Sequence, residues 1–177
     1  MAFHHVALAV KDIEATHRFY TEAMGFTLTK VDAIPSENPG GWAKHLFYDA
    51  GDGQLIAFWD LHDSALPDFD PAISTGQGLP AWVNHLAFAA HDDEHYRECL
   101  DRWLDFGIDV VEIDHDWCKS IYATDPSGTL VEWCILTRVL TDRDRDEAQR
   151  MLADPSPALV EPKMPVIHFA AERSVAL

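Results

Sequence analysis

The stretches His5-Val6-Ala7-Leu8-Ala9-Val10-Lys11-Asp12 and His85-Leu86-Ala87-Phe88-Ala89-Ala90-His91-Asp92 decide the fold, because they repeat one pattern 80 residues apart. Each starts at a histidine, alternates larger side chains with small ones, and ends at an aspartate. Alternation of this kind predicts a β-strand. An aspartate directly after a strand is a good N-cap for a following helix. The repeat therefore predicts two halves of similar structure.

The same order of elements is predicted after each of these strands. Helices are expected over about 12–24 and 92–106, each ending at a glycine, Gly25 or Gly107. Three more strands complete each half, over 26–31, 41–48 and 54–59 in the first and over 108–113, 117–123 and 129–135 in the second. Both halves read β-α-β-β-β, which predicts an α+β protein.

The chain divides accordingly into four parts. We expect a first module over 1–60, a linker over 61–80 that carries Pro, Asp and Gly, and a second module over 81–135. The segment 136–177 has no counterpart in the first half. It is expected to form a helix capped by Thr141 and then a Pro-rich extended arm, packed on the body or on a second subunit, or else disordered.

Composition excludes several classes of function. The chain of 177 residues has 13 Lys and Arg against 30 Asp and Glu, a formal charge of −17, which excludes a basic nucleic-acid-binding protein. Its three cysteines contain no Cys-x-x-Cys pair, which argues against a disulfide framework and a thiolate zinc site and favours the cytoplasm. The sequence has no run of 18 apolar residues, which argues against a membrane span. It also has no glycine-rich loop of the kinds that bind phosphate or dinucleotides.

Three residues on predicted strands have the chemistry of metal ligands. Strand alternation places His5 and His85 on equivalent faces, each beside alanines that leave room for the imidazole. Glu132 stands where a half-buried strand normally carries an apolar residue, so its carboxylate needs a partner. Taken alone, a strand histidine is more often a hydrogen-bonded core or edge residue, and a glutamate often faces solvent. Together, two histidines and one carboxylate form the ligand set typical of non-haem Fe(II) sites, and this set also suits Mn(II).

The chain resembles the vicinal oxygen chelate superfamily over roughly residues 3–135. This superfamily includes glyoxalase I, fosfomycin-resistance proteins, bleomycin-resistance proteins and extradiol ring-cleavage dioxygenases. The resemblance implies two β-α-β-β-β modules that form a cupped, partly closed eight-stranded sheet, with helices outside and one metal inside. The family's metal ligands fall on His5, His85 and Glu132. Ala57 stands where glyoxalase I has a fourth ligand, which counts against a glyoxalase.

The second half is most similar to the one-domain extradiol dioxygenases. The run from Ile113 to Glu132 matches their signature and carries two further roles onto His115 and Tyr122. An imidazole is suited to moving a catechol proton, and a phenol can donate a hydrogen bond to a developing oxyanion. The family's further active-site histidine, a little upstream of the second metal ligand, has no equivalent over 74–82.

The resemblance implies an Fe(II)-dependent dioxygenase of aromatic catabolism, with Mn(II) or another divalent metal as alternatives. Its partners would be a small catechol-like substrate and O2, and a homo-oligomer is compatible with the sequence. One alternative is another metalloenzyme of this fold, an isomerase, epimerase or thiol transferase. The other is a non-catalytic protein that binds a small molecule.

Overall fold

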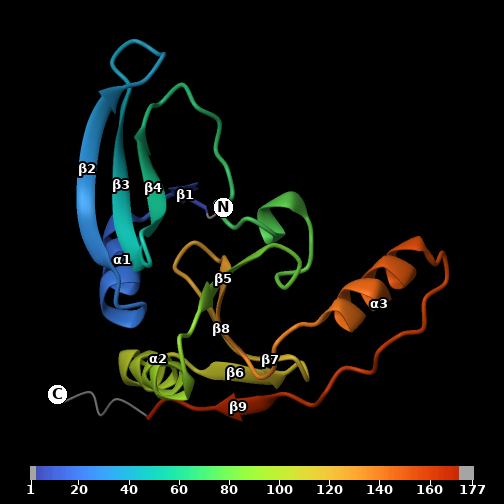
Figure 1. Cartoon of the computed structure of the whole chain (residues 1–177). Helices are drawn as coiled ribbons and strands as arrows, with labels where there is room; N and C mark the ends of the chain where they lie inside the picture. The colour runs from blue at the N-terminus through green and yellow to red at the C-terminus, as the bar shows by residue number, and fades with distance from the viewer. Residues whose placement is uncertain (1–2, 172–177) are drawn as a thin grey trace.

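The computed structural model describes residues 3–171 and folds each predicted module around its own sheet (Figure 1). Sheet A has the strand order β1-β4-β3-β2, and sheet B has the order β5-β8-β7-β6-β9. The strands of sheet A are β1 (His5–Val10), β2 (Thr27–Pro35), β3 (Trp42–Gly51) and β4 (Gln54–His62). The strands of sheet B are β5 (His85–Ala89), β6 (Val110–Asp114), β7 (Cys118–Thr124), β8 (Leu130–Leu136) and β9 (Val166–His168).

The register confirms the repeat. In each sheet the first strand runs parallel to the last strand of its module, so that His5 pairs with Leu55 and His85 pairs with Leu130. Two residues further along, Ala57 and Glu132 occupy the same place in their sheets. We call the face of each sheet that carries His5 or His85 its inner face.

Helices begin where the sequence predicts. The Asp12 side chain accepts a hydrogen bond from the Ala15 amide at the start of α1 (Ile13–Arg18), and Asp92 caps α2 (Asp93–Phe106) in the same way. Gly107 ends α2 in the left-handed conformation, at φ +94°. That conformation is strained for any side chain with a Cβ, which explains the glycine.

The first helix differs from the prediction of one α-helix over 12–24. After Arg18 the chain forms a π-helical turn, η1 (Phe19–Ala23), in which the Met24 amide donates to the Phe19 carbonyl. A wider turn places more residues on one face of a helix. Here it buries the consecutive rings of Phe19 and Tyr20, which are 2% and 0% exposed.

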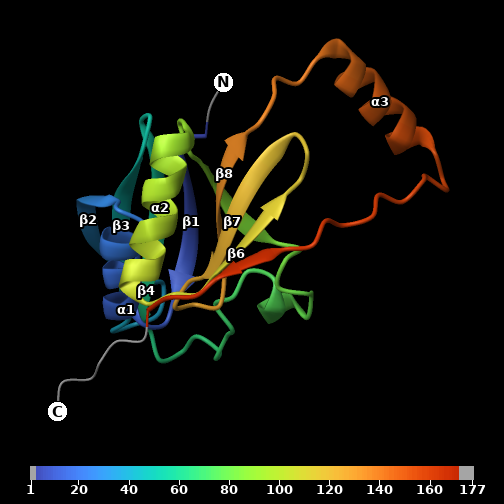
Figure 2. The same cartoon turned by 90° about the horizontal axis from the view of Figure 1, so that it is seen from below.

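One hydrophobic core joins the two modules on the outer side of the sheets. Helices α1 and η1 lie beside α2 (Figure 2), and the fully buried Trp103 of α2 belongs to the same core cluster as Phe19, Tyr20 and Ile121. The Tyr20 hydroxyl also donates to the Asp125 carboxylate in the β7–β8 turn, at 3.0 Å. The helices therefore lie outside and the inner faces stay open, as expected for this fold.

The sheets approach each other at β1 and β5. A cavity of about 420 Å3 lies between these strands, and its lining includes Val6, His85 and Phe88.

The linker between the modules contains a short 3-10 helix, η2 (Thr75–Gln77).

The C-terminal segment leaves β8, forms α3 (Asp142–Ala153) and returns as β9 along the edge of β6 (Figure 1). Thr141 caps α3 as predicted.

No helix in the described part of the chain is long and apolar enough to cross a membrane.

Candidate active site

The structure brings together two of the three predicted metal ligands. Glu132 is 6% exposed, and its Oε2 lies 3.0 Å from the Nε2 of His85. The two residues come from neighbouring parallel strands, β8 and β5, and both lie on the inner face of sheet B. The buried carboxylate therefore has the partner that the sequence demanded.

A backbone contact fixes the orientation of the His85 ring. Its Nδ1 lies 3.1 Å from the carbonyl oxygen of Trp82, which can only accept a hydrogen bond. Nδ1 must therefore carry the proton, and in the neutral ring Nε2 presents a lone pair toward Glu132. Histidines that bind metals through one nitrogen commonly donate the other N–H to a backbone carbonyl in this way.

The donor set of this pair fits a divalent metal ion. An unprotonated imidazole nitrogen and a carboxylate oxygen are both acceptors, so a shared proton or a cation stabilises them at such a distance. Two atoms bound at right angles to one metal, with bonds of about 2.1 Å, lie about 3 Å apart. The separation between His85 and Glu132 matches that value.

The predicted proton-handling residues lie directly beside this pair. Tyr122 is the cross-strand partner of Glu132, and its hydroxyl lies 2.9 Å from the Nε2 of His115. The Tyr122 and His85 rings are 6.4 Å apart. Burial raises the pKa of Tyr122 to about 12, so the hydroxyl keeps its proton near neutral pH and can donate it in a hydrogen bond.

His5, the third predicted ligand, is not gathered with the other two. It lies on the inner face of sheet A, where its side chain is exposed and its Nδ1 is 2.7 Å from the Nδ1 of His4. Within residues 3–171 no three His, Cys, Asp or Glu side chains form a metal-binding group. Four of the five predicted site residues therefore form one contiguous cluster on sheet B, and His5 lies apart from it on sheet A.

One further histidine, which the sequence did not single out, lies on the inner face of sheet A. His45 on β3 stacks on Trp59 at 3.7 Å, and its ring centre lies 6.4 Å from that of His5. Its Nε2 is buried without a hydrogen-bond partner. Burial, followed by the neighbouring His5, lowers its pKa. The alternation of β3 was the available signal, because it places His45 and Phe47 on one face.

Comparison with known proteins identifies the family. The family model described as the Glyoxalase/Bleomycin resistance protein/Dioxygenase superfamily matches residues 2–133. The chain belongs to this superfamily. No curated protein sequence matches the chain.

Solved structures of the superfamily share the fold. A glyoxylase/bleomycin resistance protein/dioxygenase domain from Frankia sp. EAN1pec has a TM-score of 0.58 and 15% identity, over 77% of this chain and 98% of that chain. A putative dioxygenase from Bacillus subtilis subsp. subtilis str. 168 has a TM-score of 0.55 and 17% identity, over 76% and 40%. A lactoylglutathione lyase from Agrobacterium tumefaciens has a TM-score of 0.50 and 23% identity, over 76% and 92%.

Proposed function

We propose that this member of the superfamily is an Fe(II)-dependent extradiol-type dioxygenase that cleaves a catechol-like aromatic ring with O2. The observation that carries the proposal is the contiguous cluster of His85, Glu132, Tyr122 and His115 on one sheet face. The metal would be held by His85 and Glu132, with His5 from sheet A as the third ligand. Such a metal supplies a positive charge that orients two vicinal oxygens of the substrate together with O2.

The residues around the metal ligands have distinct tasks in this proposal. The His115 Nε2 can accept a proton from a substrate hydroxyl, because it already faces a hydroxyl at 2.9 Å. Tyr122, protonated near neutral pH, donates a hydrogen bond where negative charge develops on the substrate. The Trp82 carbonyl holds His85 in the tautomer whose Nε2 carries no proton and can bind a metal.

The first module supports a site that keeps positions open for substrate and O2. Ala57, the counterpart of Glu132 in sheet A, is 0% exposed and offers no ligand atom. A site with three protein ligands leaves room for a bidentate substrate and O2, which is typical of the Fe(II) oxygenases.

The test is oxygen consumption by anaerobically purified, iron-loaded protein on addition of catechols. We expect catechol-dependent uptake that Glu132→Ala abolishes together with iron binding. Tyr122→Phe should retain iron and lose about 100-fold in rate, as for the loss of one positioned donor. Iron-loaded protein that consumes no O2 with any catechol would refute the proposal and favour an isomerase, epimerase or thiol transferase.

A further inference from the structure

The C-terminal arm, residues 136–171, lies outside the part of the chain that the superfamily model matches, which ends at residue 133. Helix α3 stands away from both sheets, and the chain then runs back to pair β9 with β6 (Figures 1 and 2). No residue of α3 is buried. A 12-residue helix is marginal in water unless its apolar side is covered, so this helix needs something to cover it.

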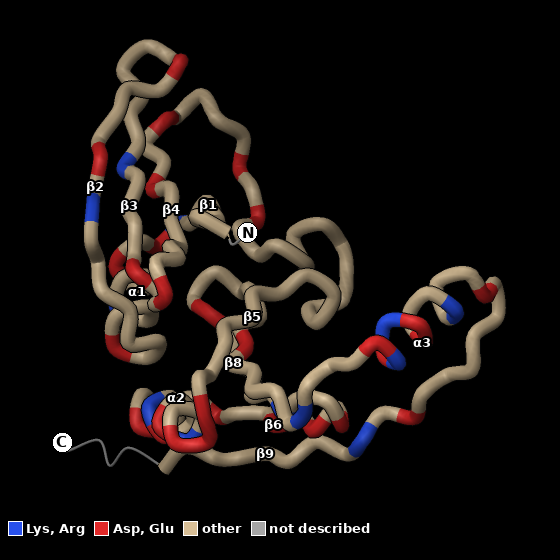
Figure 3. Tube along the Cα trace, in the orientation of Figure 1, with Lys and Arg blue, Asp and Glu red and all other residues tan. Residues whose placement is uncertain are grey.

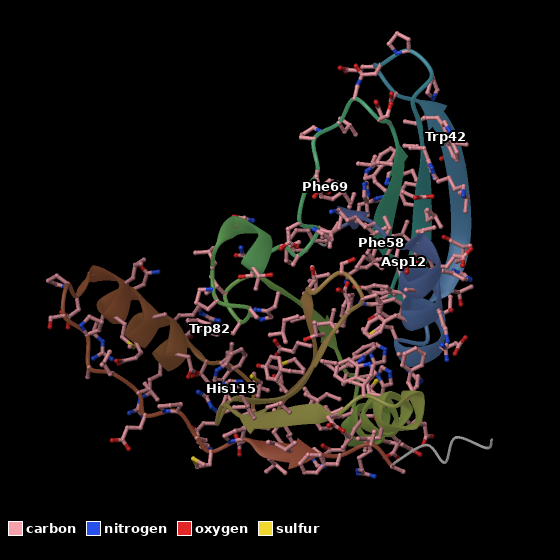
Figure 4. All side chains as sticks on the ribbon, turned by 180° about the vertical axis from the view of Figure 1, so that it is seen from behind. Asp12, Trp42, Phe58, Phe69, Trp82 and His115 are labelled. Carbon is pink, nitrogen blue, oxygen red and sulfur yellow. The ribbon has the colours of Figure 1, made fainter. Side chains whose placement is uncertain are left out.

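The arm and the turn between β6 and β7 line an open cavity of about 790 Å3. That volume is within the usual range for sites that bind small molecules. His115 lines the cavity and is also the hydrogen-bond partner of Tyr122. Figure 4 labels His115 at the end of the sheet nearest to α3. The cavity therefore adjoins the cluster to which we assign the reaction.

Part of this cavity's wall is apolar, although eight of its fifteen lining residues are charged. Trp117 and Met151 are 41% and 42% exposed, although each is large and hydrophobic. The apolar lining residues come from the β6–β7 turn, from α3 and its approach, and from the returning chain: Trp117, Leu140, Ala148, Met151, Val160 and Pro162. A wall of this kind stabilises an apolar group by removing it from water.

The cations around the cavity are already paired. Lys163 binds Asp114 at 3.3 Å and also binds Asp116. Arg138 binds Asp144 at 2.6 Å, and Arg145 binds Asp142. Acidic and basic residues alternate closely along this part of the chain (Figure 3). Because five carboxylates and three cations line the cavity, it disfavours an anionic group.

We propose that this cavity holds an uncharged apolar substituent of the substrate, with Trp117 and Met151 as specificity-determining walls. This inference rests on the proposed function and narrows it to catechols that carry an alkyl or aryl group. Carboxylated catechols are poor substrates, because their charge meets a net-acidic lining.

The test compares kcat/KM for 4-tert-butylcatechol, catechol and 3,4-dihydroxybenzoate in wild type, Met151→Asp and Leu152→Asp. Leu152 is the matched control, because it lies next to Met151 on α3 but is 82% exposed and does not line the cavity. We expect Met151→Asp to lower the preference for 4-tert-butylcatechol over catechol by about tenfold. Leu152→Asp should change it less than twofold. An unchanged preference in Met151→Asp would overturn the inference.

A binding titration separates failure of this inference from failure of the proposed function. Anaerobic quenching of tryptophan fluorescence by 4-tert-butylcatechol measures binding without turnover. If the protein consumes no O2 but binds 4-tert-butylcatechol tightly, and Met151→Asp weakens this binding, the cavity assignment stands and the dioxygenase proposal fails. Equal binding of all three catechols would overturn the cavity. A dimer in sedimentation that Met151→Asp dissociates, with no change in catechol binding, would also overturn the inference. In that case α3 would pack against a second copy of the chain rather than against substrate.

Discussion

The hydrogen bond between Tyr20 and Asp125 joins the two modules, and its loss should cost a measurable part of the stability. Tyr20 is 0% exposed and Asp125 is 5% exposed. The Oδ2 of Asp125 accepts from the tyrosine at 3.0 Å, while its Oδ1 accepts from the amides of Ser127 and Thr129. Tyr20→Phe leaves Oδ2 buried without this donor. A hydrogen bond to a charged group contributes about 1.5–3 kcal/mol, so we expect a loss of about 2 kcal/mol.

Urea unfolding at pH 7 measures this loss. With a slope of about 2 kcal/mol per molar urea, the midpoint should fall by about 1 M. Tyr48→Phe is the matched control, because Tyr48 is also 0% exposed but bonds to a ring nitrogen of His17. We expect that control to lose about 1 kcal/mol. A loss below about 0.5 kcal/mol in Tyr20→Phe would show that the tie between the modules does not form.

The penalty should also depend on pH. Burial raises the pKa of Asp125 above its ordinary value. Folding therefore favours the protonated carboxyl, and this contribution is lost as the pH rises from about 4 through the folded pKa. Tyr20 stabilises the charged form, so the penalty of Tyr20→Phe should be smaller at pH 4 than at pH 7. A penalty that is equal at both values would contradict this reasoning.

Three further predictions concern the scaffold of the site. Burial lowers the pKa of His45, so the unfolded chain binds more protons than the folded protein below about pH 6.5. The stability of the folded protein should therefore fall as the pH falls from there. Thermal unfolding at pH 7 and pH 5.5 should show a smaller fall in His45→Gln than in the wild type. Gly107→Ala places a Cβ at φ +94° and should cost about 1 kcal/mol by thermal denaturation, whereas no cost would mean that the helix end differs. A chain ending at residue 165 lacks β9 and leaves an edge of β6 unpaired, so sedimentation should show more self-association than in the full chain.

Local signals predicted most strands and helix ends. The alternating strands, the caps at Asp12 and Asp92 and the stop at Gly107 all depend on neighbours within a few residues, so a sequence displays them directly. The register confirmed that Ala57 and Glu132 are counterparts, because strand parity determines which face a residue joins.

Several contacts between distant segments had no signal in the sequence. The pairing of β9 with β6 joins segments more than 50 residues apart, and a strand of three residues is too short to specify its partner. The contact of the Trp82 carbonyl with His85 involves a backbone atom, which has no sequence signature. The π-helical turn at 19–23 contains Phe19 and Tyr20, which pack in a core that both modules share, and such packing leaves no local signal in the sequence.

The central claim is that both sheets contribute ligands to one metal, and iron content per chain tests it most directly. We predict one Fe(II) per chain in the anaerobically loaded protein and in His62→Ala, because His62 lies seven residues beyond Leu55, the partner of His5 on β4, and is not assigned as a ligand. His5→Ala should lose at least tenfold in iron affinity, and Glu132→Ala should lose binding altogether. Full iron content and unchanged affinity in His5→Ala would contradict the claim, because the metal would then belong to sheet B alone.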